Sequence, residues 1–180
     1  MSFMKAKDAI SGKEGELLAT YTIGGSQGLG ATGTPVVVAE CKNITAKITK
    51  NKAEFKALGF RGTQYKATGW SGSGTLTIYY ATSRWAKIME TYVKSGQDTY
   101  LTLKISNYDP TSDLNQQTIL LHDVNFDEVE IAKLDVDAEF LDATMNFTFS
   151  NMEIVDEFKG EDGSLWSNES GAWEKSPDAT

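Results

Sequence analysis

The sequence predicts a mainly β protein, a barrel or sandwich with one flanking α-helix at about residues 83–95. Several short runs alternate apolar with polar residues, which is the period of a strand. Clusters of Gly, Ser, Asn and Asp separate these runs. Helices and strands do not alternate along the 180 residues, which favours a barrel or sandwich over an α/β fold. One domain is expected over residues 1–158.

The first predicted strand covers residues 16–23, and turn residues predict a glycine-rich hairpin loop over residues 24–34. A long strand with lysines on one side is expected over residues 36–49. Its aliphatic side chains alternate with Thr and Lys, which is typical of a half-buried strand. Residues 51–58 fit either a loop or a short strand.

A basic loop punctuated by glycines is predicted over residues 61–69, with a turn at Trp70. Beyond it, apolar and polar residues alternate up to Tyr80 and predict a strand. Further strands are expected over residues 100–105, 116–124, 126–134 and 145–149.

One stretch has helical periodicity, because its large apolar residues share a single stripe. Ser83 is expected to cap the helix, and Lys94 followed by Gly96 marks its end. The stripe consists of Trp85, Ile88, Met89, Tyr92 and Val93.

The two ends of the chain differ from its centre. Residues 1–13 form an N-terminal arm, either frayed or ordered against a neighbouring subunit. Residues 159–180 form an acidic C-terminal extension that cannot build its own core. Trp166 and Trp173 within it either dock on another surface or stay partly exposed. No apolar run suits a signal peptide or a membrane helix, so the chain is expected to be made and kept in the cytosol.

Composition excludes several classes of function. A formal net charge of −8 argues against a nucleic-acid-binding surface. Cys41 is the only cysteine, so no internal disulfide can form, and a buried small hydrophobe is expected there. His122 is the only histidine, which removes most metal sites and catalytic triads. No catalytic residue, metal or cofactor is predicted, and the protein is not expected to be an enzyme.

Two motifs were weighed against simpler interpretations. Residues 28–33 match the glycine spacing of a dinucleotide site, but a strand-like run follows where the phosphate-binding helix should begin. The match is therefore interpreted as a loop. Asp135, Asp137 and Glu139 alternate with Val136 and Phe140, which predicts three carboxylates on one side of an extended segment. The spacing does not fit a calcium loop, so a solvated acidic face is favoured.

Three blocks of sequence resemble a known family. They are KAKDAISGKEGE (residues 5–16), KITKNKAEFKALGFRGTQYKATGWSGSGTLTIYYATSR (residues 47–84) and AKLDVDAEFLDATMNFTFSNMEIVDEF (residues 132–158). In this order they resemble the tail tube, or inner core, protein of PBSX-like contractile-tailed phages and phage-tail-like bacteriocins.

The resemblance implies hexameric rings that stack into a hollow tube in the virion tail or a tail-like particle. Such a tube surrounds the tape-measure protein, lies inside the tail sheath, and joins the baseplate and tail terminator proteins. It passes DNA without specific binding, or pierces a membrane.

The resemblance also suggests roles for particular residues. Contacts between subunits and rings are expected at Phe3, Met4, Ile10, Phe55, Phe60, Arg61, Tyr65 and Lys66. Arg61 and Lys66 are expected to face acidic groups of an adjacent subunit or ring. Asp135, Asp137 and Glu139 are candidates for an acidic lumen.

Two alternatives stay open. One is the related tube of a type VI secretion system. The other is a monomeric β-sandwich binding module that holds a ligand with the aromatic residues Trp70, Tyr79, Tyr80 and Trp85.

Overall fold

The computed structural model describes residues 9–23, 33–59, 61–112, 114 and 116–158. Phe3, Met4, Phe60, most of the glycine-rich loop and the C-terminal extension lie outside these residues. The predictions made for those parts of the chain therefore stay predictions.

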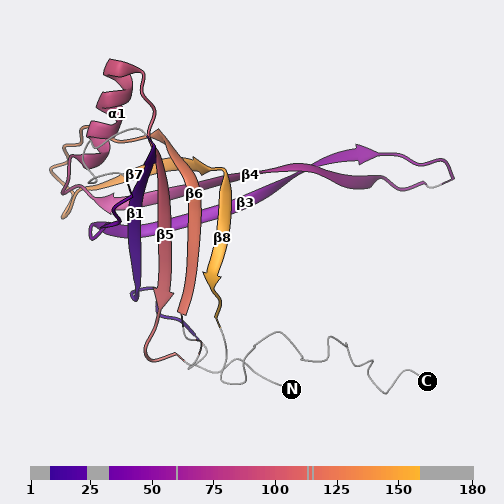
Figure 1. The fold of residues 1–180 in the computed structure, drawn as a ribbon, viewed down its shortest axis with the longest axis horizontal. Helices are drawn as coiled ribbons and strands as arrows, with labels where there is room; N and C mark the ends of the chain where they lie inside the picture. The colour runs from indigo at the N-terminus through magenta and orange to yellow at the C-terminus, as the bar shows by residue number, and fades with distance from the viewer. Residues whose placement is uncertain (1–8, 24–32, 60, 113, 115, 159–180) are drawn as a thin grey trace.

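Strands dominate the described chain, which contains one helix (Figure 1). The elements are β1 (Gly15–Ile23), β2 (Val36–Val37), β3 (Cys41–Phe55), β4 (Gln64–Tyr79), α1 (Arg84–Ser95), β5 (Tyr100–Tyr108), β6 (Gln116–Glu128), β7 (Asp142–Phe149) and β8 (Asn151–Asp156). All pairings are antiparallel, in the order β2-β1-β5-β6-β7-β4-β3, with β8 also paired to β6. The mainly β fold with one helix is confirmed.

The sheet folds into two layers because β6 changes partners along its length. Its first half pairs with β5 and β8, and its second half pairs with β7. At the change Asp123 has a φ of 53°, and Ser150, between β7 and β8, donates its backbone N–H to the carbonyl of His122 at 3.1 Å. The chain bends at this corner twice, within β6 and between β7 and β8. As a result, β3, β4 and β7 cross β1, β5 and β8 (Figure 1).

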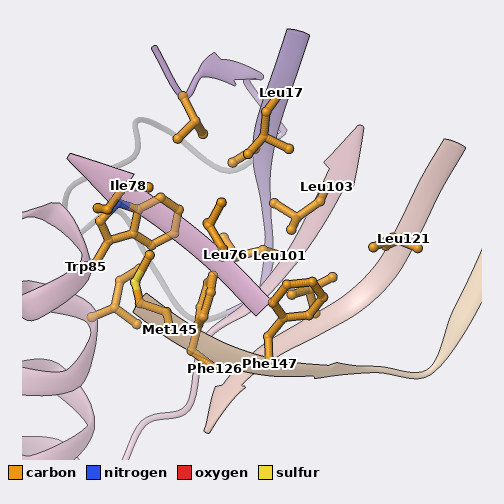
Figure 2. Close-up of a cluster of buried hydrophobic side chains, with 14 of the residues drawn as sticks. Leu17, Leu76, Ile78, Trp85, Leu101, Leu103, Leu121, Phe126, Met145 and Phe147 are labelled. Carbon is orange, nitrogen blue, oxygen red and sulfur yellow. The ribbon is translucent and has the colours of Figure 1, made fainter. Parts of the chain in front are cut away.

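The core lies between these layers and under the first half of α1 (Figure 2). Phe126 packs edge to face against Trp85 at 5.1 Å and against Phe147 at 5.9 Å between ring centroids. Leu76 and Met145 are fully buried beside them. Burial of these large side chains supplies the main driving force for the fold.

The helix forms where the periodicity predicts it. Gly96 ends α1 in the left-handed conformation, and its N–H donates to the carbonyl of Tyr92 at 2.8 Å. Ser83 occupies the N-cap position, but its side chain makes no capping hydrogen bond. Tyr92 and Val93 are exposed, although they belong to the predicted stripe, because the end of α1 rises away from the sheets (Figure 1).

The prediction of a basic loop at residues 61–69 is wrong for most of that stretch, because β4 runs unbroken from Gln64 to Tyr79. Trp70 does not turn the chain but pairs with Lys50 of β3. Residues 51–55, which fit either a loop or a strand, are the end of β3. The sequence pattern does not identify either stretch as a strand, because a strand that buries neither face shows no alternation of apolar and polar residues.

Three other boundaries differ from expectation. The predicted strand at residues 36–49 is two strands, β2 and β3, and beyond Ile44 every β3 side chain is exposed rather than half-buried. The strands expected at residues 116–124 and 126–134 are one bulged strand, β6, that ends at Glu128. The last strand, β8, was not predicted.

Candidate assembly surfaces

The β3–β4 hairpin extends beyond the body of the protein (Figure 1). The last pair between β4 and β7 joins Gly72 to Phe149, so farther out only β3 and β4 pair with each other. We call residues 49–71 the ribbon. Two-stranded ribbons are marginally stable alone in water. Beyond Gly72, this ribbon has neither a third strand nor a packed face among the described residues to support it.

The ribbon is open to solvent on both faces. Apart from Gln64, each of its described residues is exposed. Among them are the large apolar side chains of Phe55, Leu58, Tyr65 and Trp70. Apolar groups gathered on a free ribbon indicate a contact surface.

The charge of the ribbon is the opposite of the chain's net charge. Its cations are Lys50, Lys52, Lys56, Arg61 and Lys66, and its carboxylate is Glu54. Within the described residues, none of these side chains forms an ion pair. The predicted contact residues Arg61 and Lys66 are exposed and available to a partner.

Glycines fix the base of the ribbon. A Cβ on Gly74 would lie 2.3 Å from Cζ of Phe147 and 2.5 Å from the carbonyl oxygen of Thr45. A Cβ on Gly72 would lie 2.5 Å from the Phe149 ring. The two phenyl rings lie directly over β4 because these positions lack side chains.

A second exposed surface lies between β6 and β7. We call residues 130–140 the acidic loop. It contains Asp135, Asp137 and Glu139, all exposed. Their expected alternation on one side of an extended segment is wrong, because the chain bends where the N–H of Asp137 donates to Oδ1 of Asp135 at 3.0 Å. Their expected place in a lumen stays a prediction.

The acidic loop also exposes apolar side chains that the sequence analysis did not single out. Leu134 and Val136 are 99% and 97% exposed, and Ile131 and Phe140 are also largely in solvent. Exposed apolar side chains gathered in this way, four within ten positions, are typical of interaction surfaces. The alternation of acidic and apolar residues is the available signal, although by itself it predicts an extended segment with a solvated acidic face.

The ends of the acidic loop are held against the end of β4. The hydroxyl of Tyr80 donates to the carbonyl of Ile131 at 2.8 Å, and the rings of Tyr79 and Phe140 meet edge to face at 6.4 Å. Lys133 donates to the carbonyl of Asp142 at 2.8 Å. These contacts hold both ends of the loop in place, and the exposed side chains lie between them.

The cations near the acidic loop are already engaged. Hydrogen bonds from Lys42, at 2.9 Å, and from Lys133 hold the pKa of Asp142 below its usual value. Lys133 also lies 3.8 Å from Glu130. Within the described chain, Asp135, Asp137 and Glu139 therefore have no cationic partner.

The root of the N-terminal arm is tied to the β5–β6 connection. The N–H of Ser11 donates to Oδ2 of Asp109 at 2.7 Å, and the hydroxyl and N–H of Thr111 donate to Oδ1. The Thr111 hydroxyl is the main reason that the pKa of Asp109 lies below its usual value, followed by the Ser11 N–H. Ile10, a predicted contact residue, is half-buried next to this anchor.

The described residues contain no cluster of three or more potential metal ligands. Cys41 is half-buried rather than fully buried, and burial raises the pKa of its thiol. No helix in the described chain has the length and apolarity that a membrane crossing requires.

The four aromatic residues considered for a ligand site do not converge. Trp85 is buried in the core, and Tyr80 holds the acidic loop. Trp70 and Tyr79 lie nine positions apart on β4, roughly 30 Å at the usual rise of a strand. The structure therefore gives no support to a binding module built on these side chains.

A model of the phage tail tube protein family matches residues 2–156. Two proteins of Bacillus subtilis (strain 168) are each 38% identical to the chain. Phage-like element PBSX protein XkdM aligns over 151 residues, which cover 84% of this chain and 93% of the relative. Uncharacterized protein YqbM aligns over 156 residues, which cover 87% of this chain and 97% of the relative.

Solved structures share the fold at low sequence identity. A chain of the anti-feeding prophage baseplate matches with a TM-score of 0.60 and 14% identity, covering 86% of this chain and 97% of that chain. A chain of the sheath–tube complex of an extracellular contractile injection system matches with a TM-score of 0.58 and 10% identity, covering 83% and 95%. With the family model matching most of its length, the chain belongs to the phage tail tube protein family, with the structural role of a tube protein.

Proposed function

We propose that the chain assembles into hexameric rings that stack into the inner tube of a PBSX-like contractile tail or tail-like particle. The ribbon is the observation that carries this proposal. A hairpin exposed on both faces, with unpaired cations and apolar side chains, has no function within one molecule. Copies of the chain that cover one another's ribbons remove that exposure.

Free sheet edges support lateral contact within a ring. Among the described residues, β8 pairs only with β6 and β3 pairs only with β4, so each offers an unpaired edge there. Ile154 and Val155 of β8 are exposed beside one of these edges. Pairing with a neighbouring subunit protects such edges from uncontrolled aggregation.

The structural relatives support six subunits per ring and a surrounding sheath. The anti-feeding prophage structure is six-fold symmetrised, and the injection-system structure is a sheath–tube complex. By analogy, the partners of this chain are tail sheath, baseplate and tail terminator proteins, with a tape-measure protein inside the tube. With a net charge of −8, the assembled tube passes DNA without binding it specifically.

The predicted contact residues divide between two segments. Phe3, Met4 and Ile10 belong to the N-terminal arm, and Phe55, Phe60, Arg61, Tyr65 and Lys66 belong to the ribbon. Both segments are proposed to join ring to ring. The exposure of Phe55 and Tyr65, and the anchor next to Ile10, support this assignment.

The C-terminal extension is proposed to lie outside the tube, because a segment of that length inside a narrow channel would obstruct passage. Limited proteolysis of assembled tubes and of monomers measures its accessibility. Cleavage at equal rates in both forms is expected. An extension protected in tubes but cleaved in monomers would contradict the outer position.

Negative-stain electron microscopy of the purified protein over a range of concentrations tests the proposed function. Hollow rings or tubes are the expected result, with light scattering reporting the mass of the assembly. Featureless monomers at high concentration would count against a tube protein and in favour of a monomeric module.

A further inference from the structure

The chain carries two exposed apolar surfaces of opposite charge at the two ends of β4. The ribbon includes the end of β4 that begins at Gln64, and the acidic loop is held against the other end at Tyr79 and Tyr80 (Figure 1). Five cations and one carboxylate occupy the ribbon. The acidic loop has three carboxylates without a cationic partner in the described chain.

The two surfaces cannot meet within one molecule. β4 has 16 residues, so its ends lie roughly 50 Å apart at the usual rise of a strand. The tip of the ribbon lies beyond Gln64, on the side away from the loop. A contact between the two surfaces therefore requires a second copy of the chain.

The chemistry of each surface suits the other. Near the tip of the ribbon, Lys56 and Arg61 lie on either side of the exposed apolar residue Leu58 in the sequence, and Lys66 lies opposite Ala53. In the loop, carboxylates alternate with exposed apolar side chains such as Leu134 and Val136. Interfaces gain specificity from such charge complementarity, and buried apolar contacts add affinity.

We infer that the ribbon tip of one copy docks on the acidic loop of the next copy, with Lys56, Arg61 and Lys66 facing Asp135, Asp137 and Glu139. This inference rests on the proposed function and gives the ribbon a specific partner surface. The contact joins two different surfaces head to tail, so it repeats from copy to copy. Repetition of that kind builds extended assemblies.

The inference competes with the lumen role predicted for the same three carboxylates. A carboxylate that faces a channel tolerates charge reversal without loss of the tube. A carboxylate that contacts a ribbon does not, because two like charges would then meet at the interface. Charge reversal in the acidic loop therefore separates the two roles.

The test uses two variants of the full chain. The ribbon variant carries Arg61→Glu and Lys66→Glu, and the loop variant carries Asp137→Lys and Glu139→Lys. Each variant alone is expected to yield roughly tenfold less sedimenting tube than the unmodified protein, because like charges face each other. All four positions are exposed, so circular dichroism and thermal unfolding should remain unchanged.

Rescue gives the test its specificity. An equimolar mixture of the two variants, and a single chain with all four substitutions, are expected to recover tube formation, because opposite charges face each other again. A control with Lys87→Glu and Lys94→Glu reverses two exposed cations of α1, outside the ribbon and the N-terminal arm, and should assemble normally. Normal tubes from the loop variant, or no rescue in either format, would overturn the contact while leaving the proposed function intact.

Cross-linking tests the contact directly, even where tubes do not grow. Cys41→Ser removes the natural thiol, after which Lys66→Cys and Asp137→Cys place one thiol on each surface. Mild oxidation is expected to produce a ladder of disulfide-linked oligomers. A matched pair with Lys66→Cys and Lys87→Cys should give none. Monomers alone from the first pair would refute the contact, whereas an absence of rings and tubes from the unmodified chain would instead refute the proposed function.

Discussion

Two glycines of β4 have a role that only their neighbours reveal. Gly72 and Gly74 lie under the rings of Phe149 and Phe147, in the strand from which the ribbon extends. From the sequence alone, these two positions are interpreted as part of a flexible glycine-rich segment that leads into a strand. In the structure they are close-contact positions within it, because the phenyl rings of β7 occupy the space of their missing side chains.

Gly74→Ala is expected to destabilise the fold by about 1–3 kcal/mol, because the new Cβ would meet Phe147 and the backbone of Thr45. Thermal unfolding followed by circular dichroism measures the effect as a lower Tm. Gly69→Ala is the matched control, since nothing lies within 4 Å of a Cβ at that position of the same strand. An equal Tm for both variants would contradict the close contact.

Asp109 links the root of the N-terminal arm to the body and makes that link sensitive to pH. Its pKa is below the usual value in the folded protein, because the Thr111 hydroxyl and the Ser11 N–H donate to the carboxylate. A carboxyl with a depressed folded pKa stabilises the protein above its unfolded pKa, about 3.9. That contribution to stability is lost as the pH falls through the pKa that Asp109 has in the folded protein.

Asp109→Asn is therefore expected to lower the Tm at pH 7, and the difference from the unmodified protein should shrink as the pH falls below about 4. Thermal unfolding across this pH range measures it. Asp127→Asn, which changes an exposed carboxylate outside this anchor, serves as the control. A Tm difference for Asp109→Asn that does not change with pH would contradict the assigned linkage.

At the scale of elements, the sequence pattern predicts the helix correctly but does not predict the ribbon. The helix was predicted at the correct place because its first half buries Trp85 and Ile88, which creates the periodic stripe. The ribbon was missed because it buries neither face, so its sequence has no alternation to read. Its two strands are evident only from their register, such as Lys50 opposite Trp70.

Removal of the ribbon is expected to abolish assembly but to preserve the fold. Deletion of residues 52–68 joins Asn51 directly to Gly69, which already face each other in the ladder. The resulting Asn-Gly pair suits a two-residue hairpin turn. The shortened chain should remain a folded monomer.

Size-exclusion chromatography, thermal unfolding and electron microscopy check this expectation together. A Tm within a few degrees of the full chain is expected, because the deleted residues are nearly all exposed. Tubes formed by the shortened chain would show that the ribbon is dispensable. Loss of the folded state would show that the ribbon stabilises the body.

At the scale of the whole molecule, charge is distributed unevenly. The chain is acidic, with a net charge of −8, yet the ribbon is basic. If the ribbon meets the acidic loop of another copy, tube growth depends on charges near the protein surface. Salt screens such charges, and the screening length falls from about 10 Å at 0.1 M to about 3 Å at 1 M.

The critical concentration for tube assembly is therefore expected to rise as NaCl increases from about 0.1 M to about 1 M. Sedimentation of assembled material measures it. The chain with all four charge-reversing substitutions should show the same trend, since its contact is also ionic. A critical concentration that does not rise with salt would indicate that apolar contacts alone drive growth.

The sequence by itself determined the β-rich class, the single helix and the family, because periodicity and the three matching blocks are local properties of the chain. It also identified Arg61, Lys66 and the three carboxylates as chemically distinctive. Only the tertiary structure decided that β6 bends between two layers and that the ribbon stands free of the body. It alone shows that the acidic loop carries exposed apolar side chains beside its carboxylates. These features depend on contacts between residues far apart in sequence, and a strand pattern does not specify which of its faces remain uncovered.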